Sequence, residues 1–302
     1  MKYELIIVRY GEIALKGKET RKRFENTLVS NIKNAFSVEN LSSKIKKEWG
    51  RIYVYTTQIN KCVDVLQKIF GIISISPALQ TTSDMDSISK LAVDVSKEEL
   101  NKKKSFAIRA TRTGTHKFTS QDVAIKIGDE VVKATKASVD LTNPDFELFI
   151  EIRNDKAFLF TKKIRCVGGM PLGTQGNILA LIDSSESILA SWYLMHRGCK
   201  AIFLNVTESK NILKSFLGNW FVKSDISAIN SQNNIYEEIN KIAYERNCDA
   251  IVTGHTIFGG SKNVLYDIKQ IKKHVNIPIL HPLIAMNEKE INNKCKEIGL
   301  PV

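Results

Sequence analysis

The stretch ILALIDSSESILASWYLMHRG, from Ile178 to Gly198, joins an apolar run to an amphipathic segment through a short polar loop. This order predicts a strand, a sharp turn and a helix, an arrangement in which many α/β proteins hold a nucleotide's phosphates at the helix start. The loop, IDSSES, contains no glycine, although glycines usually let the backbone approach a phosphate. Because Asp183 and Glu186 stand there instead, the stretch is a nucleotide site, a decayed nucleotide site or an ordinary helix cap.

Around this stretch, apolar strands and amphipathic helices alternate to the end of the chain. Strands are predicted at 200–206 and 249–254, and helices at 186–197, 235–246 and 288–299. Continuous apolar strands separated by helices are typical of a doubly wound parallel sheet, whose ligands bind beyond the carboxyl ends of the strands. The IDSSES loop lies at such an end.

The first half of the chain has the pattern of two smaller mixed units. Strands at 3–10, 51–57 and 72–80, with helices at 18–36 and 61–71, suggest a ferredoxin-like β-α-β-β-α-β order. A second mixed α/β unit follows, with helices at 86–103 and 120–136, a strand at 105–112 and a strand pair within 146–164. The first helix carries an apolar face at a four-residue period, formed by Phe24, Leu28, Ile32 and Phe36.

The connector RCVGGMPLGTQGN, which holds four glycines and a proline, marks a further boundary. We therefore expect three parts, with no sheet shared across residues 78 or 170. The predicted limits are 1–78 for the ferredoxin-like domain, 79–165 for the second mixed α/β domain, 166–176 for the linker and 177–302 for the parallel-sheet domain.

Composition indicates a globular protein of two or three domains, because the 302 residues are 43% hydrophobic and 25% charged. We predict no membrane segment and no signal peptide, and hence a cytoplasmic protein. The cysteines have no C-x-x-C pair and no zinc-type spacing, so we expect most of them to be buried apolar residues and assign no metal site. They are Cys62, Cys166, Cys199, Cys248 and Cys295.

The positive charge lies in the first half of the chain. Residues 1–165 contain 30 Lys and Arg against 20 Asp and Glu, whereas residues 166–302 contain 14 against 12. Such asymmetry indicates that the first half binds a polyanion, with RNA as the expected one. One set of candidate RNA contacts crowds a helix start, where cations oppose the helix dipole, and a second mixes cations with Phe118. The candidates are Lys16, Lys18, Arg21, Lys22, Arg23, Arg109, Arg112, His116 and Lys117. A solvated basic face is the alternative explanation of the first set.

The order of these units, together with VRYGEIALKGKETRKRF, FAIRATR, VDLTNPDFELFIEI, GGMPLGTQGNILAL and IPILHPLIAMNEKEI, resembles the tRNA sulfurtransferases (tRNA 4-thiouridine synthetases, ThiI family). The resemblance covers nearly the whole chain, and GGMPLGTQG is a fairly specific mark of it. It implies that a ferredoxin-like domain and a THUMP domain together bind tRNA. It also implies a Rossmann-like PP-loop ATP pyrophosphatase domain that adenylates a uridine before sulfur is delivered.

Two stretches depart from that family. Its loop pattern S-G-G-x-D-S falls on the segment 182–187, where only Ser187 matches, and its T-G-E stretch falls on TGHTIFGGSKN. Asp183 suits an N-cap instead, with Glu186 at the third helical position of a capping box. The resemblance thus places a degenerate nucleotide pocket on Ala180, Leu181, Ile182, Asp183, Ser184, Ser185, Glu186, Ser187, Asn205, Val206, Gly254 and Asn263.

Two functions remain open at this point. The first is a tRNA-binding member of the family that does not adenylate tRNA alone, and the second is an active ATP-dependent tRNA sulfurtransferase that makes 4-thiouridine. ATP and Mg²⁺ are expected as cofactors only if the loop still functions, and no catalytic residue is assigned. The expected partners are tRNA and either a sulfur donor or a partner subunit, with a homodimer as a further option and no membrane.

Overall fold

Strand β4 (Ile72–Thr82) runs through residue 78 and lies in the middle of a nine-stranded sheet. Its early part pairs with β9 (Ile164–Arg165), and its last four residues pair antiparallel with β8 (Lys156–Phe160). The strand order β2-β3-β1-β4-β8-β7-β5-β6 therefore joins both halves of the first 165 residues. The expectation that no sheet crosses residue 78 is wrong, because an eleven-residue strand is long enough to pair with both sets.

The computed structural model describes residues 2–206, 210–228, 235–257 and 263–301. Two compact units are present in it. Unit 1 consists of Met1–Tyr10, Glu39–Gln67 and Ile73–Cys166, and unit 2 consists of Gly11–Val38, Lys68–Ile72 and Val167–Val302. The division does not follow the order of the sequence, because two segments of the first 78 residues cluster with residues 167–302.

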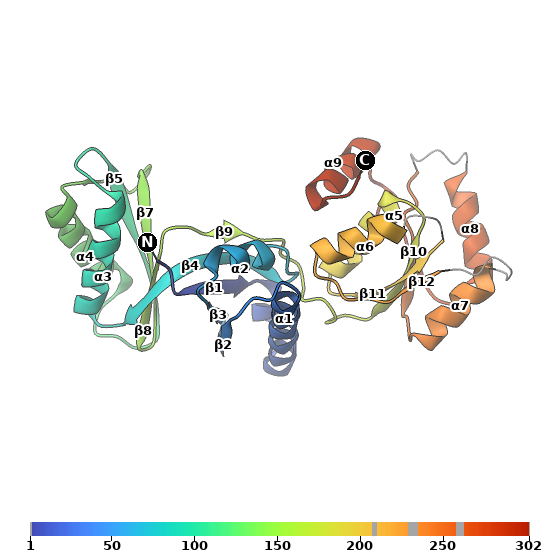
Figure 1. Ribbon diagram of the computed structural model, residues 1–302, viewed down its shortest axis with the longest axis horizontal. Coiled ribbons are helices and arrows are strands. Elements are labelled where there is room, and N and C mark those ends of the chain that lie inside the picture. Colours follow the sequence, from blue (N-terminus) through green and yellow to red (C-terminus); the bar gives the residue numbers. More distant parts are fainter. Residues whose placement is uncertain (1, 207–209, 229–234, 258–262, 302) are drawn as a thin grey trace. The chain divides into compact units, whose positions relative to one another are not determined.

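Unit 1 carries the nine-stranded sheet. Besides β4, β8 and β9, its strands are β1 (Leu5–Tyr10), β2 (Lys44–Glu48), β3 (Arg51–Tyr55), β5 (Ser105–Thr113), β6 (Ser138–Val139) and β7 (Phe146–Arg153). Its helices are α2 (Ile59–Leu66), α3 (Met85–Glu99) and α4 (Ser120–Thr135). Helices α3 and α4 lie side by side against the β5–β7–β8 part of the sheet (Figure 1), where a core that includes Ile88, Val123 and Leu148 is buried.

Unit 2 contains a five-stranded parallel sheet, which confirms the doubly wound α/β prediction. The strand order is β12 (Ile226–Ala228), β11 (Lys200–Asn205), β10 (Asn177–Ile182), β13 (Ala250–Val252) and β14 (Ile279–Leu280). Helices α5 (Ser185–His196), α6 (Lys210–Asn219) and α9 (Glu288–Ile298) cover one face. Helices α7 (Ile235–Glu245) and α8 (Val264–His274) cover the other (Figure 1).

The remaining elements of unit 2 come from the start of the chain. They are the 3-10 helix η1 (Glu12–Leu15) and the long helix α1 (Lys18–Val38). Phe24, Leu28, Ile32 and Phe36 are buried, which confirms the apolar face predicted for α1. Phe70 stacks on Trp220 with 5.4 Å between the ring centroids.

The second predicted helix ends earlier than its sequence pattern suggests. Helix α2 stops at Leu66, so Gly71 is not its C-cap. Gly71 has a φ of +99°, and a Cβ there would lie 2.9 Å from the backbone nitrogen of Pro171. The glycine therefore permits a close approach of the connector to the segment that follows α2.

No helix in the described part of the chain is long and apolar enough to cross a membrane.

Candidate nucleic-acid interface and nucleotide loop

The loop after β10 is closed by hydrogen bonds among its own residues. Ser187 Oγ accepts the backbone N–H groups of Asp183 (3.0 Å) and Ser184 (3.1 Å), while Ser184 Oγ accepts the N–H of Ser187 (3.4 Å). Backbone N–H groups at such a helix start are the donors that would hold a phosphate. Here three of them already donate to serine hydroxyls.

The N-cap of α5 is Ser184 rather than Asp183, so the predicted capping box lies one residue too early. Helix α5 begins at Ser185, which makes Ser187 the third helical residue and leaves Glu186 outside the box. Buried Ser187 supplies the reciprocal hydrogen bond that the prediction gave to Glu186. Asp183 instead accepts a hydrogen bond from the Ser184 hydroxyl at 3.1 Å.

A small cavity of about 190 Å³ opens beside this loop. Sites for small molecules usually measure about 300 to 1,000 Å³, so the space suits a fragment of a nucleotide better than the whole. Its walls carry two carboxylates, which repel phosphate. The lining residues are Asp183, Ser184, Glu186, Gly254, His255, Thr256 and Val264.

Gly254 allows the turn after β13 to lie directly on the first turn of α5. A Cβ at position 254 would lie 2.5 Å from the backbone nitrogen and 2.8 Å from the Cα of Ser187. Backbone therefore approaches the helix start from the side on which a ligand would sit.

We expect Gly254→Ala to lower the free energy of unfolding by about 1 to 3 kcal/mol, because the added methyl overpacks a rigid backbone contact. Gly218→Ala is the matched control, since that helical glycine has nothing within 4 Å of a built Cβ and should stabilise by about 0.5 to 1 kcal/mol. Urea unfolding of both variants measures the difference. Equal stability of the two would contradict the close contact.

His255 lines the cavity, and the Thr253 hydroxyl connects it to a second histidine, His281. Thr253 Oγ1 lies 2.7 Å from Nδ1 of His255 and 2.7 Å from Nδ1 of His281, so it can donate to one ring and accept from the other. Burial and then the charge of His255 lower the pKa of His281 below its ordinary value of 6.5. His281 is consequently neutral near pH 7 and contributes no positive charge toward a phosphate.

The other residues predicted for the nucleotide pocket have structural roles. Ala180 and Ile182 are buried in β10, and Ile182 lies opposite Asn205 in the parallel register. Val206 donates its N–H to the Ile182 carbonyl oxygen at 2.9 Å. Asn263 caps α8 by accepting the N–H of Tyr266, and residues 258–262 of the TGHTIFGGSKN stretch lie outside the described residues.

A basic pocket of about 610 Å³ lies in unit 1, where β1, β3, β5, β7 and β8 come together. Arg9 lies 4.8 Å from the ring centroid of Phe160, and Lys163 Nζ lies 4.2 Å from that of Phe149. The two phenylalanine rings stack with 5.2 Å between their centroids. Cations over aromatic faces are the chemistry that contacts both phosphates and bases of single-stranded nucleic acid.

The Glu151 carboxylate connects the arginines of this pocket. Its carboxylate accepts hydrogen bonds from Arg51 (2.7 Å), Arg9 (3.2 Å) and Arg153 (3.3 Å), and the residue is 6% exposed. Burial by itself raises the pKa of the Glu151 carboxyl. The charges of Arg51 and Arg9 and their hydrogen bonds outweigh burial and leave it below the ordinary 4.5. One carboxylate thus orders three arginines, and the cluster keeps a net positive charge.

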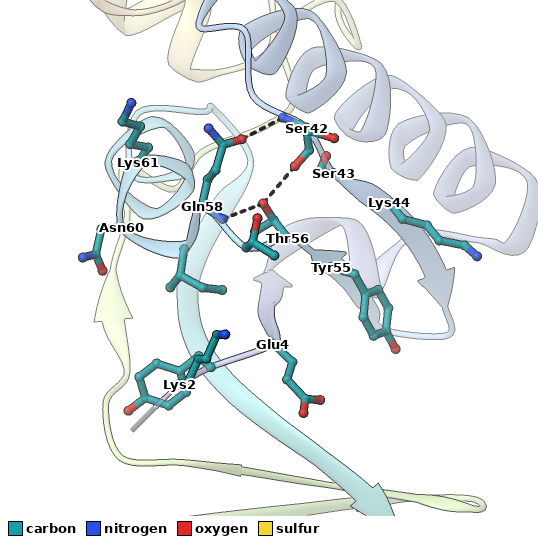
Figure 2. A pocket seen from close by; sticks show the side chains of 13 residues that line it. Lys2, Glu4, Ser42, Ser43, Lys44, Tyr55, Thr56, Gln58, Asn60 and Lys61 are labelled. Carbon is teal, nitrogen blue, oxygen red and sulfur yellow. Dashed lines mark hydrogen bonds between the residues drawn. The ribbon is translucent and has the colours of Figure 1, made fainter.

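A second, wider groove of about 1150 Å³ lies in unit 1 at the other end of β1 and β3 (Figure 2). Lysines from three segments line it: Lys2, Lys44 and Lys61. Figure 2 shows the hydrogen bonds that connect Ser42, Thr56 and Gln58 in its wall. The groove carries cations, but the Thr56 hydroxyl in its wall already donates to the Ser42 carbonyl oxygen and accepts the Gln58 N–H.

Known proteins match the chain along nearly its whole length. Family models match as the ThiI ferredoxin-like domain over residues 5–76, the THUMP domain over residues 82–162 and the thiamine biosynthesis protein (ThiI) over residues 210–300. A probable tRNA sulfurtransferase of Methanobrevibacter smithii is 33% identical, over 99% of this chain and 87% of that protein. The chain belongs to the tRNA sulfurtransferase (ThiI) family.

A further relative and two solved structures are also similar to this chain over nearly its whole length. The probable tRNA sulfurtransferase of Methanothermobacter thermautotrophicus is 33% identical, over 98% of this chain and 85% of that protein. The crystal structure of PH1313 from Pyrococcus horikoshii has a TM-score of 0.85 at 30% identity, covering 98% of this chain and all of that one. That of a 4-thiouridine synthetase–RNA complex with bound ATP has a TM-score of 0.81 at 27% identity, covering 98% and 85%.

This member of the tRNA sulfurtransferase family is shorter than its relatives within the matched region. The alignment with the Methanobrevibacter smithii protein spans 339 residues, whereas the chain has 302. The matched part of the ThiI model begins at residue 210, so the β10–loop–α5 segment lies outside that match.

The residues predicted to contact RNA fall into both units of this family member. Lys16, Lys18, Lys22 and Arg23 are exposed around the start of α1, in unit 2. Arg109 lines the basic pocket of unit 1, although Glu147 and the Leu141 carbonyl oxygen already accept its hydrogen bonds.

The end of β5 and the loop after it carry the rest of the predicted set. Arg112 donates to the Gly114 carbonyl oxygen at 2.8 Å, and His116 Nε2 lies 2.6 Å from that of Asn154. Lys117 is exposed. Sequence reasoning missed Arg9, Arg51 and Lys163. The signal that marks the two arginines is a cation within an otherwise apolar strand, whereas Lys163 stands directly before the short strand β9.

The cysteines of this family member are poor candidates for handling sulfur. Four are buried and Cys199 is partly buried, which confirms the expectation that most of them pack as apolar residues. Burial raises the pKa of all five thiols, to about 12 for Cys166 and about 11 for Cys295. Cys248 lies in a different core cluster from Cys199 and Cys295. Among the residues that the structure describes, no three His, Cys, Asp or Glu side chains group to hold a metal ion.

Proposed function

We propose that this protein binds tRNA through the basic surfaces of its first half and does not adenylate tRNA by itself. The observation that carries the first part is the pocket of Arg9, Arg51 and Lys163 over stacked phenylalanines. The two arginines lie in the stretch that matches the ThiI ferredoxin-like domain, and the two phenylalanines lie in the stretch that matches the THUMP domain. The solved 4-thiouridine synthetase in complex with RNA supports tRNA as the partner. A cytoplasmic location remains a prediction.

The second part rests on the loop after β10. Three backbone N–H groups donate to serine hydroxyls, two carboxylates line the adjoining cavity, and Gly254 brings backbone against the helix start. Each feature weakens binding of a triphosphate. We infer that the chain acts as a tRNA-binding scaffold or as the partner of a subunit that supplies the chemistry.

The alternative is an active ATP-dependent tRNA sulfurtransferase. It is favoured by the near-complete coverage of the family and by the bound ATP in the solved relative. Calorimetry with ATP, Mg²⁺ and tRNA together distinguishes the two functions. A micromolar dissociation constant for ATP, or pyrophosphate release when tRNA is added, would establish the active enzyme instead.

For tRNA, we expect Arg109→Ala combined with Lys163→Ala to weaken binding about tenfold or more at physiological salt. The slope of log K against log salt should become shallower by between about one and two, because binding releases fewer counterions when fewer phosphate contacts form. Both side chains are at least partly exposed, so the fold should survive. Filter binding across a salt series measures both quantities.

The control is Lys44→Ala with Lys61→Ala, which removes the same charge from the groove of Figure 2. Equal losses from both pairs would show that the net charge alone binds tRNA and that the pocket has no special role. A triple alanine variant of Arg21, Lys22 and Arg23 tests the α1 set in the same assay. It should also lower the affinity and the salt slope. Point substitutions are preferred to a fragment cut at residue 166, because residues 11–38 belong to unit 2.

A further inference from the structure

An indole stands exposed at the tip of the β2–β3 hairpin. Trp49 is 68% exposed, whereas the other two tryptophans, Trp192 and Trp220, are 3% and 9% exposed. Trp49 and Gly50 are the two central residues of a turn whose flanking residues, Glu48 and Arg51, pair across the strands. Tryptophan buries much apolar area elsewhere in this protein, so its exposure here needs a reason.

The turn itself does not need an aromatic residue. Gly50 has a φ of +75°, and Trp49 is not among the residues with positive φ, which is the pattern of a type II turn. That turn requires glycine at position 50 and accepts most residues at position 49. The turn therefore explains Gly50 but does not require tryptophan at position 49.

The turn is held rigidly by side chains from other strands. Lys156 Nζ donates to Glu48 Oε1 at 2.8 Å, and buried Arg153 donates to the Trp49 carbonyl oxygen. Arg51 Nη1 donates to the Gly50 carbonyl oxygen at 2.7 Å. An aromatic ring on a fixed backbone loses little conformational entropy when it binds a partner.

The surroundings of the indole are cationic. Arg51, two residues along, lines the basic pocket, and the adjoining strand β2 exposes Lys46 and Lys47. The cores of protein–protein interfaces are poor in lysine, whereas single-stranded nucleic-acid sites combine cations with aromatic stacking platforms. The charge around Trp49 thus favours RNA over a protein partner.

We propose that Trp49 stacks on an unpaired base of the bound RNA while Arg51 and its neighbours hold the adjacent phosphates. The inference rests on the proposed tRNA binding and adds a base-contacting residue to it. Stacking on an aromatic ring is tolerant of sequence, because every base has a π face. Trp49 would therefore strengthen binding to unpaired nucleotides of any sequence and contribute little to a fully paired duplex.

The test compares Trp49→Ala and Trp49→Phe with the unmodified full-length chain. We expect Trp49→Ala to weaken tRNA binding about tenfold with an unchanged salt slope, and Trp49→Phe to retain most of the affinity. Binding of a blunt RNA duplex should be the same for all three proteins. Tyr244→Ala removes an even more exposed aromatic from α7 in unit 2 and should leave tRNA binding unchanged.

Acrylamide quenching gives a second readout that does not depend on affinity. In the unmodified protein, tRNA should shield tryptophan emission from acrylamide, and this protection should disappear in Trp49→Phe because the remaining indoles are buried. Normal tRNA binding by Trp49→Ala, with no shielding of the indole, would overturn the inference and leave the proposed function intact. A change in oligomeric state in place of tRNA affinity would assign the indole to a protein interface and also overturn it. Failure of the unmodified chain to bind tRNA would instead refute the proposed function.

Discussion

Replacing Asp183 and Ser184 with glycine and Glu186 with aspartate should strengthen ATP binding by up to about a thousandfold. Two like charges about 4 Å apart repel by roughly 4 kcal/mol at an effective dielectric near 20, which corresponds to that factor. The Asp183 carboxylate lines the small cavity at the start of α5, so its charge acts where a phosphate would lie. Glu186→Asp restores the residue of the family loop and keeps the negative charge, so the gain comes from the loss of the Asp183 carboxylate. The unmodified protein should bind ATP more weakly than about 1 mM.

The glycine at position 184 contributes separately. Ser184 Oγ accepts the N–H of Ser187, so its removal returns one backbone donor to a ligand. Ser187 is kept because it matches the family loop, although its hydroxyl still accepts two N–H groups in the present structure. The gain in ATP affinity should therefore stay below the upper limit set by charge repulsion if that serine keeps its place.

Calorimetry with Mg²⁺ and ATP measures this change, and Glu245→Gln serves as a control that removes an exposed carboxylate at the far end of α7. The control should bind ATP as weakly as the unmodified chain. Tight binding by the unmodified chain would contradict the proposal outright. If the triple variant binds ATP as weakly as the unmodified chain, the three replaced residues are not what prevents ATP binding. Gly254 and its backbone contact would then be the next position to examine.

Sequence patterns predicted the parallel sheet of unit 2 because β10, β11 and β13 consist mainly of apolar residues, and because helices α7 and α9 each have one buried apolar side. The patterns missed α8, whose exposed Leu265 and Tyr266 obscure the helical period. They also missed α6 and the edge strand β2, whose sequence KIKKE has no apolar alternation and which forms by pairing with β3. A local sequence pattern therefore predicts a helix or strand only where one face of that helix or strand is buried.

The position of the loop after β10 could be predicted from the sequence, but its capping residue could not. Its position followed from the strand and helix on either side, whereas the capping residue depended on where α5 begins, which differs by one residue from the expected start. The basic pocket could not be predicted at all. Arg9, Arg51 and Glu151 are separated by up to 142 residues, and only the strand order of the nine-stranded sheet brings them together.

Replacing Glu151 with alanine should lower the free energy of unfolding by about 3 to 5 kcal/mol. The change leaves three arginines, of which Arg9 and Arg153 are largely buried, without the carboxylate that accepts their hydrogen bonds. Glu147→Ala is the matched control on the same strand, because Glu147 binds Arg109 as a half-exposed pair. Its loss should cost less than about 1 kcal/mol. Urea unfolding near neutral pH measures both variants, and similar losses would show that the buried cluster contributes no more than a surface pair.

The pH dependence of this contribution has a defined sign. The arginines hold the pKa of the Glu151 carboxyl below its ordinary value of 4.5, despite the opposing effect of burial. Folding therefore gains from the ionised form, and this gain is complete above pH 4.5 and is lost as the pH falls through the lowered folded-state pKa. The difference in unfolding free energy between the unmodified chain and Glu151→Gln should consequently be constant near neutral pH and shrink in acid. A difference that grows in acid would mean that the carboxyl is protonated in the folded protein, and the pocket would then carry one more positive charge toward its ligand.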